Sequence, residues 1–220
     1  MPDDMPASTD LSSIDLASAI SSRICHDLVS PVGAIVNGID LVREIGTPGL
    51  DDEVAMIGQS ADRASGLLQF FRLAFGAAPL DAQPMGRAVL RDQARGVVEW
   101  QRVSLDWDSV DGPAFSRGEA KLLSLMVLCL RSIAGMAGTI SVRLMPDATL
   151  PMRVVLNGPG TVDADERLSL LSVEQPGPGP SAREVEFVLA RQTAQSMGLG
   201  LTVQRDEAET SLVALPAARL

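Results

Sequence analysis

The sequence predicts a two-domain α+β protein, in which a helical hairpin that dimerises into a four-helix bundle is followed by an α/β sandwich. Two long stretches, 9–45 and 51–75, carry apolar residues at helical spacing and are separated by only a few turn residues. The remainder alternates between short strand patterns and apolar helical patterns, which is typical of helices packed on a sheet. We therefore expect a hairpin domain at 1–80 and a second domain at 81–220.

The first helix is expected to begin at the capping residues Ser8–Asp10 and to run to about Ile45. Apolar residues spaced by three, four and seven form a single stripe along it. These residues are Ile14, Ala17, Ile24, Leu28, Ile35 and Val42. Pro31 lies inside this helix, where its missing N–H and its ring should produce a kink at a cost of about 3 kcal/mol.

The second helix is expected to follow the tight turn Gly46–Gly49 and to begin at Asp51–Glu53, because acidic residues suit a helix N-terminus. Its apolar stripe comprises Val54, Ile57, Ala61, Ala64, Leu68, Phe71 and Phe75. A single hairpin cannot bury two such stripes, so pairing with a second copy is expected. The product would be a homodimer built on a four-helix bundle.

Beyond a linker at Gly76–Pro84, helices and strands alternate. Helical patterns cover 85–99, 119–135 and 181–197, and strand patterns cover 103–107, 139–144, 152–156, 201–204 and 211–215. Hydrophobic residues make up 46% of the chain but aromatic residues only 3%, so the core must be mainly aliphatic. The Pro-Gly repeat Pro176–Pro180 should be a loop.

Composition argues against several kinds of partner and location. A net charge of −10 disfavours binding to nucleic acid. No stretch is long and apolar enough to cross a membrane, and the first ten residues lack the basic segment and apolar core of a signal peptide. The two cysteines, Cys25 and Cys129, are then expected to be reduced thiols in a cytoplasmic protein.

His26 is the only histidine in the 220 residues. At about 100° per residue it lies nearly opposite Ile24, Leu28 and Ile35, so it should face solvent and not the core. A single histidine cannot form a multi-histidine metal site, but neutral imidazole is a nucleophile or base near neutral pH. Small or polar residues share its helix face and would let a partner protein approach closely. They are Ala19, Ser22, Arg23, Ser30, Gly33, Asn37 and Asp40.

The run His26–Pro31 resembles the phosphoacceptor motif of two-component histidine kinases: a histidine, an acid, two further residues, a Thr, Asn or Ser, and proline. The wider segment Arg23–Ile35, with Asn37–Gly38 and Phe71–Ala77, is similar to the ChpT family of histidine phosphotransferases of the alphaproteobacterial cell-cycle phosphorelay. The resemblance is strong over about residues 10–80. It implies a kinase-like dimerisation hairpin followed by a degenerate histidine-kinase ATP-binding (Bergerat) domain.

The second domain departs from the ATP-binding pattern that this resemblance implies. The kinase helix that holds Mg²⁺ carries N-x-x-x-N, whereas the matching helix here has Leu125 and Cys129 and no Asn. The first glycine box would need an Asp where Leu156 stands. Gly198–Gly200 follows the last helix, where it fits a C-cap and turn. Pro176–Pro180 takes the place of the second box, and its prolines supply no N–H donors. We expect no ATP, no other cofactor and no metal in this chain.

By resemblance, a receiver domain that carries an aspartyl phosphate and its own Mg²⁺ docks against the first helix, and His26 attacks phosphorus in line. Asp27 would bond the other ring nitrogen and fix the tautomer. The donor would be the receiver of a CckA-like hybrid histidine kinase, and the acceptors would be CtrA-like and CpdR-like response regulators. Partner binding is expected on the helix face formed by Ser22, Arg23, Ser30, Gly33 and Asn37.

Other interpretations stay open at this point. Asp27 could be an ordinary solvated acid, Arg23 a surface arginine instead of a partner for phosphoryl charge, and Ser30 a residue that only bonds the helix backbone near the proline. The protein could also be an ATP-dependent histidine kinase with unusual boxes, or a non-catalytic dimeric scaffold in which His26 is incidental. Nucleotide binding and phosphorylation of His26 distinguish these functions.

Overall fold

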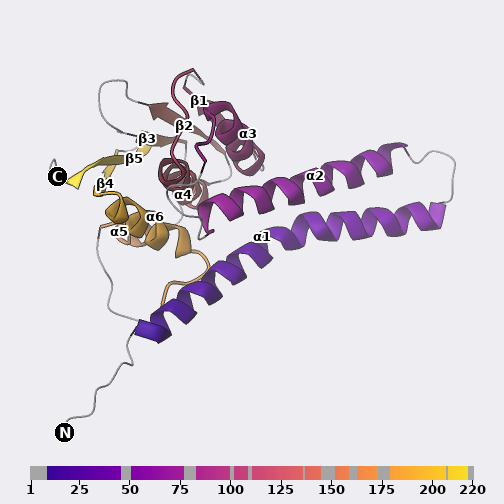
Figure 1. The fold of residues 1–220 in the computed structure, drawn as a ribbon. Coiled ribbons are helices and arrows are strands. Elements are labelled where there is room, and N and C mark those ends of the chain that lie inside the picture. The colour runs from indigo at the N-terminus through magenta and orange to yellow at the C-terminus, as the bar shows by residue number, and fades with distance from the viewer. Residues whose placement is uncertain are drawn as a thin grey trace, which may run out of the picture.

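The computed structural model shows a long helical hairpin attached to an α/β sandwich (Figure 1). The described residues are 9–45, 51–76, 83–99, 102–108, 111–135, 137–144, 152–158, 163–172, 179–206 and 208–217. Helices α1 (Thr9–Ile45) and α2 (Asp51–Ala74) form the hairpin, and the turn expected at Gly46–Gly49 lies outside the described residues. Pro31 lies inside α1 as expected, and the helix bends part-way along its length (Figure 1).

The sandwich contains a five-stranded mixed sheet in the order β1-β2-β3-β5-β4. Its strands are β1 (Val103–Trp107), β2 (Gly138–Leu144), β3 (Met152–Asn157), β4 (Leu199–Arg205) and β5 (Glu209–Pro216). β1 pairs with β2 in parallel, and the other three pairs are antiparallel. Each strand overlaps the range that its sequence pattern predicts. Burial alternates along β1, whereas β2, β3 and β5 bury consecutive residues, as strands in the middle of a sheet do.

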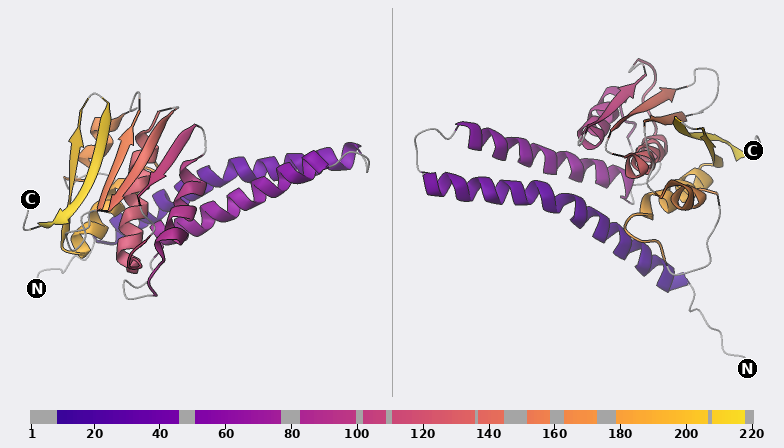
Figure 2. Two further views of the ribbon diagram at one scale, coloured as in Figure 1. Left: turned by 90° about the horizontal axis from the view of Figure 1, so that it is seen from above. Right: turned by 180° about the vertical axis from the view of Figure 1, so that it is seen from behind.

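Four helices accompany the sheet in the described part of this domain: α3 (Arg87–Val98), α4 (Arg117–Ile133), α5 (Ala164–Ser169) and α6 (Val185–Ser196). α4 and α6 pack against strands β3 and β4 (Figure 2). The sequence did not predict α5, since six residues are too few to show helical periodicity. α6 begins four residues later than expected, because residues 182–184 form a turn. A capping box between Ser116 and Glu119 starts α4.

One aliphatic core joins the sandwich to the near end of the hairpin. Phe70 and Phe71 of α2 are at most 2% exposed and belong to the same buried cluster as α4 and the sheet. On α1, Leu16, Ile20, Ile24 and Leu28 pack against this cluster. The core therefore continues across the boundary expected near residue 80, and it holds the N-terminal half of α1 beside the sandwich.

The apolar stripes predicted for the hairpin are only partly right. Ile14, Val54 and Leu68 are 50% exposed or more, whereas Ala19 and Leu67, which the stripes omit, are buried. The physical reason is that each helix has more than one packing partner. Because α1 contacts both α2 and the sandwich, its buried residues do not follow a single line.

Further out, the hairpin projects away from the sandwich (Figures 1 and 2). Along the length of the hairpin, several large apolar side chains are uncovered. We define the open apolar face as Val29, Val32, Val36, Ile39, Val54 and Leu68. On α1 its members are spaced by three and four residues, which is the spacing of a helix seam. None of the helices in the described residues combines the length and apolar character needed to cross a membrane.

Candidate functional site

His26 stands on the exposed side of α1, and its side chain is 75% exposed. Its Nδ1 lies 2.9 Å from Oδ1 of Asp27, the next residue. In the neutral imidazole this contact requires Nδ1–H to donate to the carboxylate, which leaves the lone pair on Nε2. The arrangement presents a nucleophilic nitrogen to whatever approaches this face of the helix.

Asp27 is held from its other side by Arg23, one turn earlier on α1. Arg23 Nε lies 3.2 Å from Asp27 Oδ2, and both side chains are largely buried. The same guanidinium lies 3.8 Å from Oε1 of Glu186, a fully buried residue of α6. A line of polar groups thus runs from the exposed imidazole into the sandwich, so the second domain contributes to how the histidine is held.

Burial raises the pKa of the Glu186 carboxyl, and the nearby Arg23 guanidinium opposes that rise. The sequence analysis did not identify Glu186. It lies in the first turn of α6, whose other buried residues are apolar apart from Thr193. Nothing in the sequence relates it to Arg23, which is far away along the chain. An acid among the buried positions of an amphipathic helix is the only signal that could have marked it.

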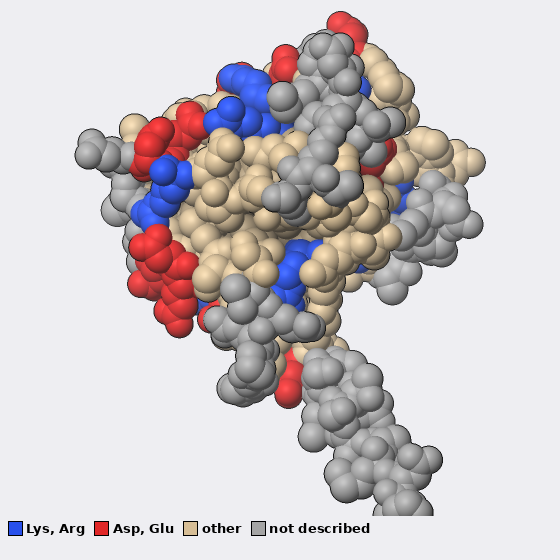
Figure 3. All heavy atoms as spheres, turned by 90° about the vertical axis from the view of Figure 1, so that its left-hand side faces the viewer, with Lys and Arg blue, Asp and Glu red and all other residues tan. Residues whose placement is uncertain are grey.

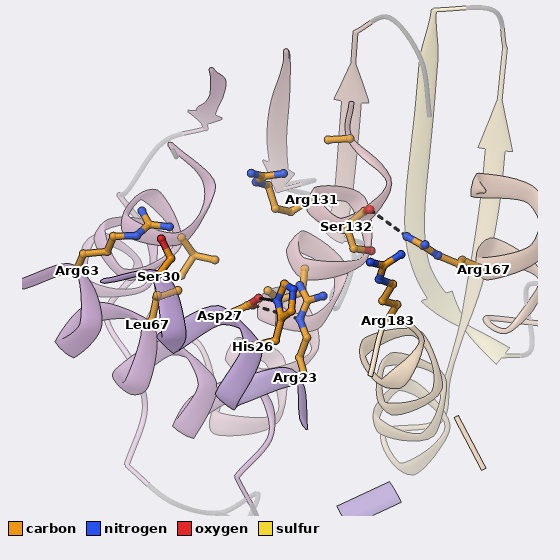
Figure 4. A pocket seen from close by; sticks show the side chains of 13 residues that line it. Arg23, His26, Asp27, Ser30, Arg63, Leu67, Arg131, Ser132, Arg167 and Arg183 are labelled. Atoms are coloured by element: carbon orange, nitrogen blue, oxygen red, sulfur yellow. Dashed lines mark hydrogen bonds and ion pairs between the residues drawn. The ribbon is translucent and has the colours of Figure 1, made fainter. Parts of the chain in front are cut away.

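A cavity of about 420 Å³ opens beside His26, between the hairpin and the sandwich (Figure 4). Its lining residues are Arg23, His26, Asp27, Ser30, Arg63, Leu67, Val97, Leu128, Arg131, Ser132, Ala134, Arg167 and Arg183. Four of the residues singled out from the sequence therefore come together at one cavity, namely Arg23, His26, Asp27 and Ser30.

Three further residues predicted for partner binding lie outside this cavity. Ser22 and Asn37 are exposed, and they flank His26 at helical spacing on the same side of α1. A Cβ added at Gly33 would meet no atom within 4 Å, so this part of the helix is open to a close approach. The predicted docking surface is therefore uncovered in the chain, while the arginines of the cavity lie to one side of it.

Comparison with known proteins agrees with this geometry. Residues 87–209 match the family described as the histidine phosphotransferase C-terminal domain. A curated relative, protein phosphotransferase ChpT from Brucella abortus (strain 2308), is 35% identical over 145 residues, which span 66% of this chain and 68% of that protein. The chain belongs to the histidine phosphotransferase family. The resemblance drawn from the sequence is confirmed, and it now extends over the second domain.

A solved structure shows that the whole fold of this histidine phosphotransferase is shared with another phosphotransferase. A bacterial phosphotransferase determined at 1.7 Å matches with a TM-score of 0.75 and 26% identity, covering 98% of this chain and all of that one. The hairpin followed by a mixed α/β sandwich is thus the fold of a known phosphotransferase. As a protein of this kind it acts together with kinases and response regulators.

The second domain of this phosphotransferase does not fit a nucleotide at the positions compared with kinases. Leu125 and Cys129 are completely buried in α4, and Leu156 lies in the core on β3. Burial also raises the pKa of the Cys129 thiol well above its ordinary value, so this residue is a neutral core group. None of the three offers an oxygen to Mg²⁺ or an acceptor to adenine.

The segment Gly198–Gly200, interpreted as a C-cap and turn, fits that interpretation only at Gly198. Gly198 follows α6 with φ +69°, and its N–H donates to the carbonyl of Gln195, which is a helix C-terminal turn. Leu199 and Gly200 belong to β4. Most of the Pro-Gly repeat, 176–178, lies outside the described residues.

Proposed function

We propose that this protein is a cytoplasmic phosphorelay intermediate that moves a phosphoryl group between receiver-domain aspartates through phosphohistidine at His26, without ATP. The observation that carries the proposal is the exposed imidazole whose Nδ1 is engaged by Asp27. This leaves Nε2 as the nucleophile in the only histidine of the chain. The partner supplies the phosphoryl group and Mg²⁺.

In the first step the Nε2 lone pair forms a bond to phosphorus while the bond from phosphorus to the aspartyl oxygen breaks. The electron pair of the broken bond returns to the aspartate as a carboxylate, and the proton stays on Nδ1, where Asp27 accepts its hydrogen bond. The reverse reaction on a second receiver completes the relay. Because this transfer depends mainly on alignment and charge stabilisation, the chain needs only to hold His26 in position.

The cognate receivers are proposed from the family resemblance. A CckA-like hybrid kinase would be the donor, and CtrA-like and CpdR-like regulators would be the acceptors. Support for their docking place comes from the open surface at Ser22, Gly33 and Asn37, on the helix side of His26. Replacing Asn37 with Ala should change the rate with one receiver more than with another, while the fold stays intact.

The test of the phosphoacceptor is direct. The full chain is incubated with a phosphorylated receiver, and the label that it acquires should be acid-labile and base-stable. The His26→Ala protein should fold as the parent does, since His26 is mostly exposed, and should acquire no label. Labelling of the His26→Ala protein would overturn the mechanism, and its failure to fold would indicate a structural role instead.

Independence from ATP rests on apolar side chains at Leu125, Cys129 and Leu156, where the kinase pattern needs oxygen-bearing groups. Calorimetry with Mg²⁺–ATP at millimolar concentration should show no binding heat. A dissociation constant in the micromolar range would favour the ATP-dependent kinase instead.

We further propose that the functional unit is a homodimer in which the open apolar face is covered by a second copy. Six large exposed apolar side chains along one hairpin favour this, because large exposed apolar surface is uncommon on monomers. A charge at Val36, which is 50% exposed, should dissociate the dimer as judged by sedimentation. Leu28 is not a suitable site for this test, because it packs inside the chain. Asn37→Glu, one residue along, is the matched control and should remain dimeric.

A further inference from the structure

Arginines gather at the cavity beside His26 from five separate places in the chain. We define the arginine pocket as Arg23 of α1, Arg63 of α2, Arg131 of α4, Arg167 of α5 and Arg183 of the turn before α6. Figure 4 shows Arg63 and Ser30 on the hairpin side, and Arg131, Arg167 and Arg183 on the sandwich side. Among the residues that line the cavity, Asp27 is the only acid.

This concentration of positive charge runs against the composition of the chain, whose net charge is −10. On the surface seen in Figure 3, by contrast, acidic and basic side chains lie close to one another. Burial and the neighbouring Arg131 guanidinium lower the pKa of Arg63, and burial and Arg23 lower the pKa of Arg131, while the Asp27 carboxylate opposes both shifts. Within the lining, Asp27 offsets only part of this positive charge, and a bound anion would offset more of it.

The cavity suits one kind of anion in particular. Guanidinium groups bind phosphoryl oxygens through paired N–H donors, and such charged hydrogen bonds are stronger than neutral ones. His26 itself lines the cavity, so a phosphoryl group on its Nε2 would be attached at the edge of this cluster. About 420 Å³ leaves room for that group and for the long arginine side chains to close around it.

We propose that the arginine pocket binds the phosphoryl group of phosphohistidine 26 between the two transfer steps. This inference rests on the proposed function and goes beyond it, since it assigns the second domain a role in stabilising the phosphorylated state. Arg23 is already fixed by Asp27 and Glu186, and Arg167 donates to the carbonyl of Ser132. Arg131 and Arg183 take no part in these particular contacts, so their substitution leaves the contacts of Arg23 and Arg167 in place.

The test is the equilibrium distribution of phosphoryl groups between a receiver and this protein. Arg183→Met and Arg131→Met should each lower the equilibrium ratio of phosphohistidine to phosphoaspartate by about tenfold, as expected for loss of one charge-assisted hydrogen bond. A role in receiver docking alone would change the rates and leave this ratio unaltered. Arg43→Met is the matched control, since Arg43 is an exposed arginine at the far end of α1.

A second measurement separates the histidine-linked phosphoryl group from a diffusible one. Inorganic phosphate should bind weakly to the unphosphorylated protein, less well to Arg131→Met, and not to the phosphorylated protein, whose pocket is filled. Equal binding to the phosphorylated and unphosphorylated forms would overturn the inference in favour of a free phosphate ligand. An unchanged equilibrium ratio in both arginine variants would also overturn it while leaving the phosphoacceptor role of His26 standing. Failure of His26 to become phosphorylated would overturn both proposals.

Discussion

The hairpin and the sandwich differ at the places where a histidine kinase has its chemistry: the hairpin exposes polar side chains, and the sandwich buries apolar ones. On α1, His26 and Ser30 are exposed, and the charged neighbours of the imidazole are aligned toward it. In the sandwich, the helix that would hold a nucleotide in a kinase is packed with apolar side chains and is buried along nearly its whole length. Under the proposed function, the second domain therefore supports the histidine instead of binding a nucleotide.

That support has two components in the structure. The aromatic pair Phe70 and Phe71 joins the hairpin to the sandwich core, and the contact from Glu186 to Arg23 joins them again beside the site. A domain with a purely structural role would need the aromatic junction but not the contact between Glu186 and Arg23. Substitutions at the junction, beside the imidazole and at Glu186 should therefore affect different properties: the stability, the transfer rate and the pH dependence of stability.

The largest effect on stability is expected at the junction. Phe70→Ala should lower the free energy of unfolding by about 3–5 kcal/mol, because Phe70 is completely buried where the two parts share a core. Urea unfolding gives this value. Val89→Ala on the exposed side of α3 is the control and should cost less than about 1 kcal/mol. Equal losses in the two variants would mean that the hairpin and sandwich do not depend on this contact.

A smaller effect, confined to transfer, is expected from Asp27→Asn. The amide can still contact Nδ1 but no longer favours the tautomer with its lone pair on Nε2. Transfer from a phosphorylated receiver should slow by about 10- to 100-fold, the range seen when a carboxylate that orients a metal-binding imidazole is removed. Single-turnover kinetics at saturating receiver measure this. Ser22→Ala, on the same helix face, should change the saturated rate little, and an undiminished rate in Asp27→Asn would make Asp27 a bystander.

The smallest effect is a pH dependence at Glu186. Its pKa is raised above the ordinary value of 4.5 in the folded chain, so the folded state holds this proton more tightly than the unfolded state. The stability of the parent relative to Glu186→Gln should then be highest below about pH 4.5 and decline as the pH rises through the raised pKa. Unfolding of both proteins between pH 4 and 8 gives the difference. An increase in this difference with pH would contradict the assigned burial effect.

Periodicity and a short motif were sufficient to predict much of this molecule. The two hairpin helices, all five strands and the exposed position of His26 follow from spacing alone, because each depends on residues close together in the sequence. The match to a phosphoacceptor motif then placed Asp27 beside the imidazole, and the structure shows that contact.

What the sequence could not give is the contribution of residues that are distant along the chain. Arg131, Arg167 and Arg183 meet the hairpin only after folding, and no local pattern distinguishes them from surface arginines. The same is true of Val36, whose apolar side chain is 50% exposed. Which residues of α1 face α2, the sandwich or solvent is decided by tertiary packing. A single apolar stripe read from the sequence does not contain this information.

The most direct test of the account is a complete relay in the absence of nucleotide. A phosphorylated donor receiver and an unphosphorylated acceptor receiver are mixed with a catalytic amount of this protein, with Mg²⁺ present and ATP removed. The account predicts that label passes from donor to acceptor, with transient phosphohistidine on His26, and that His26→Ala stops the transfer. Transfer that continues in the His26→Ala protein, or that appears only when ATP is added, would contradict it.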